Sequence, residues 1–251
     1  MAQINARARS MIATFRQLGW RDGAWHACAR LLQAVPGQRC ALHRYRFVAQ
    51  PVAPGSLCRG RGKAIVVAPC LSPQELPAGP PRPRAVLEQR YRQGAQCLVA
   101  RVNGHDAAMA GWLWLLRGAC QEDEVRARYL LAPQASWDLD VWVHPDQRGA
   151  LVLARLWEEA NALLHAQGVR WSVSRIARAN RASLAAHARL GAVALGWATF
   201  LRWGYWQWMA SSLPPYLHLS RHPGSFPRFA FDARLLPATP SPEIPCHKPK
   251  P

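Results

Sequence analysis

The chain has 251 residues, half of them apolar, and a formal net charge of +18 at pH 7. This composition predicts a sizeable core, and no stretch reaches the roughly 20 continuous apolar residues that a membrane-spanning helix needs. The seven cysteines show no CxxC spacing and their number is odd, which argues against a zinc site or a disulfide framework. Free thiols of this kind fit a reducing cytoplasm, and the N-terminus has no apolar core typical of a secretory signal.

The positive charge is concentrated in the first third of the chain. Residues 1–84 contain thirteen arginines and lysines against Asp22 and Glu75, which leaves +11 in this region. An excess of this size favours anionic partners, namely nucleic acid, an anionic membrane surface or a phosphate-bearing cofactor. A generally arginine-rich proteome would explain the excess equally well.

Residues 1–37 read as a basic helical extension. The apolar residues of its first part share one helical face: Ile4, Met11, Phe15 and Leu18. Such a helix could lie on a membrane surface or pack on the domain. A second helical segment, AWHACARLLQAV, ends at a Pro-Gly pair.

From residue 38 the pattern changes to strands, loops and crossover helices. CALHRYRFVAQPV alternates with period two, as a strand with one solvated face does, and KAIVVA is a short strand between loops. RAVLEQRYRQG is predicted to be a helix that stops at Gly94. QCLVARV and AAMAGWLWLLRG form a predicted hairpin around the turn Asn103-Gly104.

The second half continues with strands and helices in alternation. YLLAPQASWDLDVWV carries a strand that leads through a short basic turn into an amphipathic helix, from about Gly149 to Gln167. After the strand VRWSVSRIA, the segment NRASLAAHARLG predicts a short helix with Asn180 as its N-cap and Gly191 at its end. The last strand region ends near Met209.

The expected fold class is α/β (α+β), with a mixed, mostly antiparallel central sheet flanked by helices. Three parts are predicted: the extension of residues 1–37, a domain of residues 38–210, and a tail of residues 211–251. The proline density of this tail predicts irregular chain without packed elements.

Two segments of the domain resemble motifs of the GNAT acyltransferases, the GCN5-related N-acetyltransferase superfamily. VHPDQRGALVLARL, from Val143 to Leu156, is similar to the family's strand, proline, Arg-Gly-x-Gly-x-Gly/Ala turn and helix. In NRASLAAHARLGA, five residues stand at the offsets of the family's second motif: Asn180, Ser183, His187, Leu190 and Gly191. The resemblance covers about residues 85–205, which include the preceding hairpin.

The resemblance implies acetyl-CoA or another acyl-CoA as the cofactor, because the family's turn holds the pyrophosphate of coenzyme A. Amides at a helix start lack partners and attract phosphate, and Arg148 adds a permanent cation. The predicted cradle consists of Gln147, Arg148, Gly149, Ala150 and Leu151. The predicted contacts of the pantetheine arm are Val141, Val143 and Asn180. Leu151 and Leu153 stand where the family has small residues, and they could crowd the phosphates.

Three side chains are predicted to carry the chemistry of acyl transfer to an amine. Asp138 and Asp140 alternate along their strand and are expected to share a face, where either could act as general base. A solvated strand face explains both acids as well. His187 replaces a tyrosine that protonates the CoA sulfur in many family members, and histidine can do the same. A core histidine is the alternative, and no metal site is expected.

The predicted function is therefore an acyl-CoA-dependent N-acyltransferase in the cytoplasm, acting by direct transfer in a ternary complex. The acceptor is an amine on a small molecule, an amino sugar or a protein. The alternative is a catalytically inactive GNAT-like module that binds an anionic partner, a membrane surface or nucleic acid, through the Arg-rich first third. Peripheral contact with an anionic membrane is compatible with either function. Nucleic acid ranks last because no platform of interleaved basic and aromatic residues is evident.

Overall fold

The computed structural model describes most of the chain in eight segments: residues 19–20, 22–32, 34, 40–76, 82–103, 108–149, 151–232 and 234–236. Four predictions fall wholly or partly outside these residues: the first amphipathic helix, the hairpin turn after Asn103, the cradle residue Ala150 and the end of the tail from residue 237. Within the described residues, no helix has the length and apolar character needed to cross a membrane.

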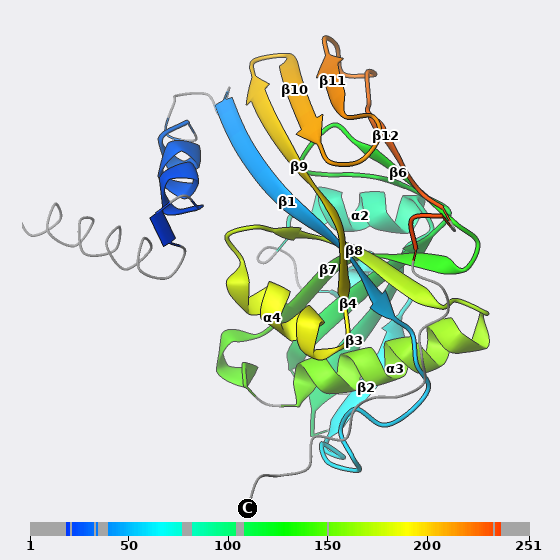
Figure 1. Cartoon of the computed structure of the whole chain (residues 1–251). Helices are drawn as coiled ribbons and strands as arrows, with labels where there is room; N and C mark the ends of the chain where they lie inside the picture. Colours follow the sequence, from blue (N-terminus) through cyan, green and yellow to red (C-terminus); the bar gives the residue numbers. More distant parts are fainter. Residues whose placement is uncertain are drawn as a thin grey trace, which may run out of the picture. The chain divides into compact units, whose positions relative to one another are not determined.

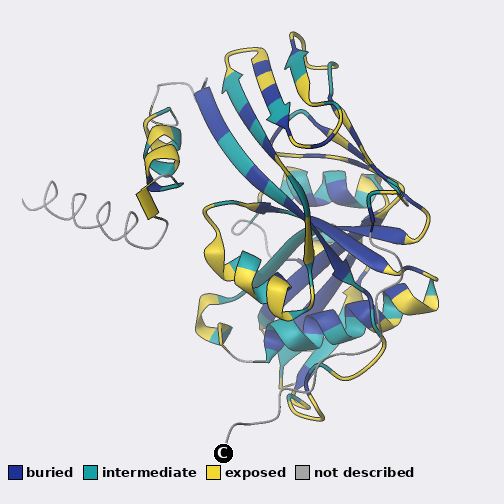
Figure 2. Ribbon diagram, viewed as in Figure 1, coloured by how far each residue is buried: buried dark blue, intermediate teal, exposed yellow. Residues whose placement is uncertain are grey.

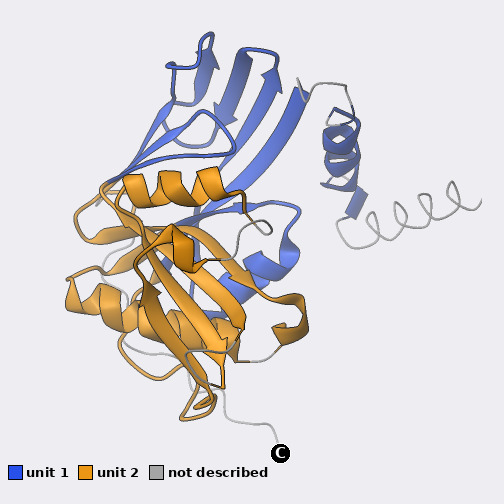
Figure 3. Ribbon diagram, turned by 180° about the vertical axis from the view of Figure 1, so that it is seen from behind, with its two compact units in different colours: residues 1–50, 119–130, 174–230 blue, residues 51–118, 131–173, 231–251 orange. Residues whose placement is uncertain are grey.

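The chain forms two compact units, each assembled from segments distant in sequence (Figure 3). Unit 1 consists of residues 1–50, 119–130 and 174–230, and unit 2 consists of residues 51–118, 131–173 and 231–251.

Unit 2 is built on an antiparallel sheet in the strand order β7-β4-β3-β2. Its strands are β2 (Ile65–Cys70), β3 (Gln96–Val102), β4 (Met109–Arg117) and β7 (Ala135–Val143). The neighbouring strand β8 (Trp171–Ala177) begins in unit 2 and ends in unit 1. Two short 3₁₀ helices, η2 (Pro73–Glu75) and η3 (Pro145–Gln147), and two α-helices, α2 (Arg84–Arg92) and α3 (Val152–Ala166), complete the unit. The predicted hairpin is confirmed as β3 and β4.

α3 lies along the sheet because its apolar residues recur at helical spacing (Figure 1). Its buried residues are Val152, Leu156, Trp157, Ala160, Asn161 and Leu164. The predicted helix is thus confirmed, but it begins at Val152, because Gly149 adopts a positive φ of 85°, which is not helical. Leu153 is only half-buried, and Val152 fills the core position beside Gly111.

β7 contains an irregularity that separates its two acids. Trp114 of β4 pairs with Asp140, whereas the next residue, Leu115, pairs with Asp138. Neighbouring residues of a strand point to opposite faces, so the two aspartates also lie on opposite faces. The prediction that they share a face was wrong, because one extra residue at Leu139 reverses the alternation.

Unit 1 contains a second antiparallel arrangement, in the order β11-β10-β9-β1. Its strands are β1 (Cys40–Pro51), β9 (Val193–Trp203), β10 (Trp206–Ser211) and β11 (Leu217–Ser220). Most of a smaller sheet also lies here, with strands β5 (Ala119–Gln121), β6 (Arg128–Leu131) and β12 (Arg228–Phe231) in the order β12-β6-β5. Helix α4 (Arg181–Arg189) follows β8, and residues 19–20 and 22–32 are helical.

Part of the proline-rich segment after residue 211 packs into the core of unit 1. Phe229 of β12 contacts the rings of Phe47, Tyr129 and Phe200, with centroids 5.3–6.4 Å apart. The prediction that proline density precludes regular elements after residue 211 was therefore wrong for β11 and β12. Among the described residues, Pro214 and Pro215 precede β11, and Pro223 and Pro227 lie between β11 and β12. At these positions no ladder hydrogen bond is lost. The predicted domain boundaries stay a prediction.

Candidate functional site

The turn between β7 and α3 is fixed by its own backbone. The amide of His144 donates to the carbonyl of Ala110 at 2.8 Å, which holds the end of β7 against β4. The amides of Gln147 and Arg148 donate to the carbonyls of His144 and Pro145 at 2.9 and 3.2 Å, which closes η3. Two amides of the predicted cradle are thus used within the turn. Amides open to a ligand can begin only after Arg148.

The start of α3 has no side-chain cap. Leu151 stands at the N-cap position and makes no capping hydrogen bond, and the amide of Arg155 donates to the Leu151 carbonyl at 2.8 Å. The amides of a helix's first turn lack intrahelical acceptors, and the helix dipole adds positive potential there. Gly149 adopts φ +85°, a conformation that favours glycine. Apart from its chain neighbours, the described residues place no atom within 4 Å of the position a Cβ would occupy. This helix start is therefore open to an anion.

The leucine at the cap lies against a neighbouring loop. Leu151 Cδ1 and Cβ lie 3.3 and 3.4 Å from the position of a Cβ on Gly62, which itself has φ +74°. This contact directs the Leu151 side chain toward the loop and not over the first turn of α3. The residues present therefore fit the diphosphate of a coenzyme, although small side chains are replaced by leucine.

The loop around Gly62 brings further cations to α3. The amide of Cys58 donates to Glu158 Oε2 of α3 at 3.1 Å, which ties the loop to the helix. Three exposed cations follow on the same loop: Arg59, Arg61 and Lys63. Sequence reasoning missed their position. The available signal was the alternation of glycine with basic residues in RGRGK, which allows close approach of a backbone to a helix.

Asp140 is engaged in ion pairs within unit 2. Its carboxylate accepts two hydrogen bonds from Arg82, both at 3.0 Å, and a third from Arg90 Nη1 at 3.1 Å. Arg90 belongs to α2 and is buried. A carboxylate held by two guanidinium groups is poorly placed to accept a proton, so this geometry favours a role in anchoring α2. Asp138 is buried on the opposite face.

The two residues predicted on α4 have defined partners in unit 1. Asn180 Oδ1 accepts a hydrogen bond from the amide of Ser183 at 3.1 Å, so the predicted N-cap is confirmed. His187 is buried, and its Nδ1 lies 3.0 Å from Gln50 Oε1. Burial lowers the pKa of His187 to about 4, so the imidazole is neutral near pH 7. The acid role of His187 stays a prediction that this low pKa opposes.

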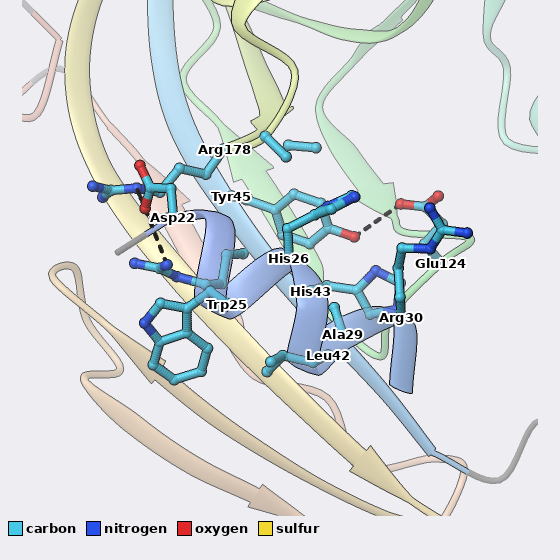
Figure 4. Close-up of a pocket in the computed structure, with 13 residues that line it drawn as sticks. Asp22, Trp25, His26, Ala29, Arg30, Leu42, His43, Tyr45, Glu124 and Arg178 are labelled. Carbon is cyan, nitrogen blue, oxygen red and sulfur yellow. Dashed lines mark hydrogen bonds and ion pairs between the residues drawn. The ribbon is translucent and has the colours of Figure 1, made fainter. Parts of the chain in front are cut away.

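Unit 1 also contains a pocket, with several charged side chains in its lining, that the sequence did not predict (Figure 4). Its volume is about 270 Å³, and it is lined by the helix of residues 22–32, by β1 and by the end of β8. Its charged and titratable lining includes Asp22, His43, Arg44, Tyr45, Glu124 and Arg178.

One end of the pocket holds a carboxylate beside a histidine. Glu124 Oε2 accepts hydrogen bonds from the Tyr45 hydroxyl at 2.8 Å and from Arg175 Nη1 at 2.9 Å. Burial alone would raise the pKa of Glu124, but Arg175 and Tyr45 outweigh it and the net pKa is lowered. His43 stacks on the Tyr45 ring with centroids 5.8 Å apart, and burial lowers the pKa of His43. At neutral pH this end therefore offers a carboxylate and a neutral imidazole.

The other end of the pocket has an excess of positive charge. Asp22 accepts hydrogen bonds from Arg44 Nη1 at 3.2 Å and from Arg178 Nε at 2.7 Å. Two guanidinium groups against one carboxylate leave a net charge of +1. Figure 4 shows Asp22 and Arg178 on one side of the pocket and Glu124 on the other. Such a polarity fits a small molecule that carries an amine at one end and an anionic group at the other.

Comparisons with known proteins find similarity in fold alone. No family model and no curated protein sequence matches the chain. A GNAT-family protein from Novosphingobium aromaticivorans is 18% identical, with 73% of this chain and 81% of that chain covered and a TM-score of 0.46. A tandem GNAT protein from the clavulanic acid biosynthesis pathway is 18% identical, with 69% and 55% covered and a TM-score of 0.40. A conserved protein of unknown function from Staphylococcus epidermidis is 10% identical, with 70% and 67% covered and a TM-score of 0.44.

Two of these three solved structures are GNAT proteins. The predicted α/β class, with a mixed and mostly antiparallel sheet flanked by helices, is confirmed by the observed strands and helices.

Proposed function

We propose that the chain is an acyl-CoA-dependent N-acyltransferase that transfers an acetyl group directly to an amine in a ternary complex. The observation that carries this proposal is the uncapped start of α3, which follows β7 through a turn containing Gly149 at positive φ. The exposed guanidinium of Arg148 lies in the same turn. This arrangement supports the proposal, because the resemblance to the GNAT superfamily implies an anion-binding turn at this position.

Different residues of unit 2 would bind different parts of the coenzyme. The amides of the first turn of α3 and the guanidinium of Arg148 would bind the diphosphate. The backbone of β7 at Val141 and Val143 would hydrogen-bond the pantetheine arm as an added strand does. When bound, acetyl-CoA supplies a thioester, the electrophile of the transfer. Ala150 and Asn180 stay predicted contacts.

The pocket of unit 1 is our candidate for binding the acceptor. An ammonium group would be attracted by the ionised Glu124 and could give a proton to the neutral imidazole of His43, since acyl transfer requires the free amine. The excess charge of Arg44 and Arg178 would select an amine that also carries a carboxylate or phosphate. The proposal uses neither Asp138, which is buried, nor Asp140, which is ion-paired, as the base.

The test is release of the CoA thiol from acetyl-CoA, followed with a thiol reagent across a panel of amines with and without an anionic group. We expect turnover with members that carry both groups. Glu124→Gln should raise KM for the amine, whereas Glu75→Gln, an exposed acid of unit 2, should leave KM unchanged. No thiol release with any amine would support the inactive module. The ion pairs of Asp140 and the burial of Asp138 favour that alternative.

A further inference from the structure

β9 and β10 carry large apolar residues on both faces. On the inner face, Phe200 and Met209 pair with each other and are buried. On the outer face, Trp206 pairs with Trp203 and Trp208 pairs with Leu201. A strand that is apolar on both faces is typical of a sheet covered on both sides.

The outer face nevertheless remains largely exposed. We call it the aromatic face and define it by six residues that the strand registers place together: Trp197, Leu201, Trp203, Trp206, Trp208 and Leu217. Trp203 is 61% exposed and Leu217 is 77% exposed. Figure 2 shows exposed residues along β10 and β11, and Tyr205 at the hairpin tip is 79% exposed. An exposed apolar patch of this kind marks an interaction surface.

A shallow groove crosses the aromatic face. Its volume is about 500 Å³, and its lining is mainly apolar and includes Leu201, Trp208 and Leu217. Trp25, from the helix of residues 22–32, and Leu42 of β1 also line the groove. The groove therefore has room for aliphatic groups from a partner.

The described part of unit 1 that forms the aromatic face carries a net positive charge. Residues 174–230 contain seven arginines and no aspartate or glutamate. The described acids of unit 1 are each in an ion pair with arginine: Asp22, Glu122, Asp123 and Glu124. Arg46 of β1 pairs in register with Trp197, which places it on the aromatic face. A second copy of the chain would meet this surface with the same charge, so self-association is opposed by repulsion, whereas an anionic surface is attracted.

We propose that the aromatic face docks on the surface of an anionic lipid bilayer. Tryptophan and tyrosine are enriched at membrane interfaces, where an apolar ring with a polar tip matches the headgroup boundary. The aliphatic side chains of Leu201 and Leu217 suit acyl chains better than nucleobases. Arginines near the surface add attraction to anionic headgroups. This inference does not depend on the proposed acyltransferase activity.

The test is cosedimentation of the full chain with vesicles of phosphatidylcholine, with or without phosphatidylglycerol. We expect binding to the anionic vesicles, weaker binding to phosphatidylcholine alone, and a decrease with added salt. Trp206→Ser/Trp208→Ser should lower the partition coefficient by about tenfold or more, because two indole rings no longer leave water. Leu71→Ser, which removes an 82% exposed apolar side chain from unit 2, is the matched control.

Two results would overturn the inference. One is binding of the double variant to anionic vesicles with the wild-type partition coefficient. The other is a wild-type dimer, seen by sedimentation velocity, that the double variant disperses while vesicles bind neither protein. Both substituted tryptophans are exposed, so an unchanged circular dichroism melting curve will show that the variant is folded. Titration with acetyl-CoA on the same samples separates this test from that of the proposed function.

Discussion

The buried imidazole of His187 should make the protein less stable in acid. Its ordinary pKa is 6.5, and burial lowers the pKa to about 4 in the folded protein. The unfolded chain therefore binds a proton below pH 6.5, whereas the folded chain binds it only near pH 4. The difference of about 2.5 pKa units corresponds to about 3 kcal/mol of stability, present near pH 7 and lost as the pH falls from 6.5 to 4.

The assay is urea unfolding followed by tryptophan fluorescence at about pH 7 and about pH 4.5, for the wild type and His187→Phe. Phenylalanine does not titrate, so the loss of unfolding free energy between the two pH values should be smaller in the variant by about 2.5 kcal/mol. His165→Phe, an exposed histidine of α3, controls for the substitution itself. Equal acid losses in the wild type and His187→Phe would refute the reasoning.

Three further substitutions test the packing. Asp140→Asn should destabilise the protein by about 3 kcal/mol in urea unfolding, since buried Arg90 loses its carboxylate; the exposed Asp146→Asn should change stability by under about 0.5 kcal/mol, and equal effects would contradict the ion-pair account. Phe231→Ala should cost about 3 kcal/mol, because the ring is fully buried; unchanged thermal unfolding would show that β12 is not part of the core. Gly62→Val should lower both the stability and the affinity for CoA, because a valine would strain the positive φ and its side chain would press on α3. A variant with wild-type CoA affinity would show that this loop does not support the cradle.

Local patterns predicted those parts of the fold that depend on neighbours in sequence. The hairpin of β3 and β4, the capping of α4 by Asn180 and the glycine ending of α2 follow from turn, cap and periodicity signals. β12 was missed, because the burial of Phe229 depends on Phe47, which lies far away in sequence.

The site was harder to predict for the same physical reason. The bulge at Leu139 reverses the faces of the two acids, and no local signal in WDLDVWV marks it. The contact between Gly62 and Leu151 joins segments separated by most of unit 2. The pocket beside Glu124 is assembled from four separate segments, so no single motif could indicate it.

The central claim is that the open start of α3 and the guanidinium of Arg148 bind the diphosphate of coenzyme A. Calorimetric titration of acetyl-CoA into the wild type, Arg148→Glu and the control Arg92→Glu, which reverses another exposed charge of unit 2, tests it most directly. We predict micromolar binding by the wild type and Arg92→Glu, and an affinity at least about tenfold weaker for Arg148→Glu, because a carboxylate then faces the phosphates. No binding at millimolar acetyl-CoA, or equal affinity in all three proteins, would contradict the claim.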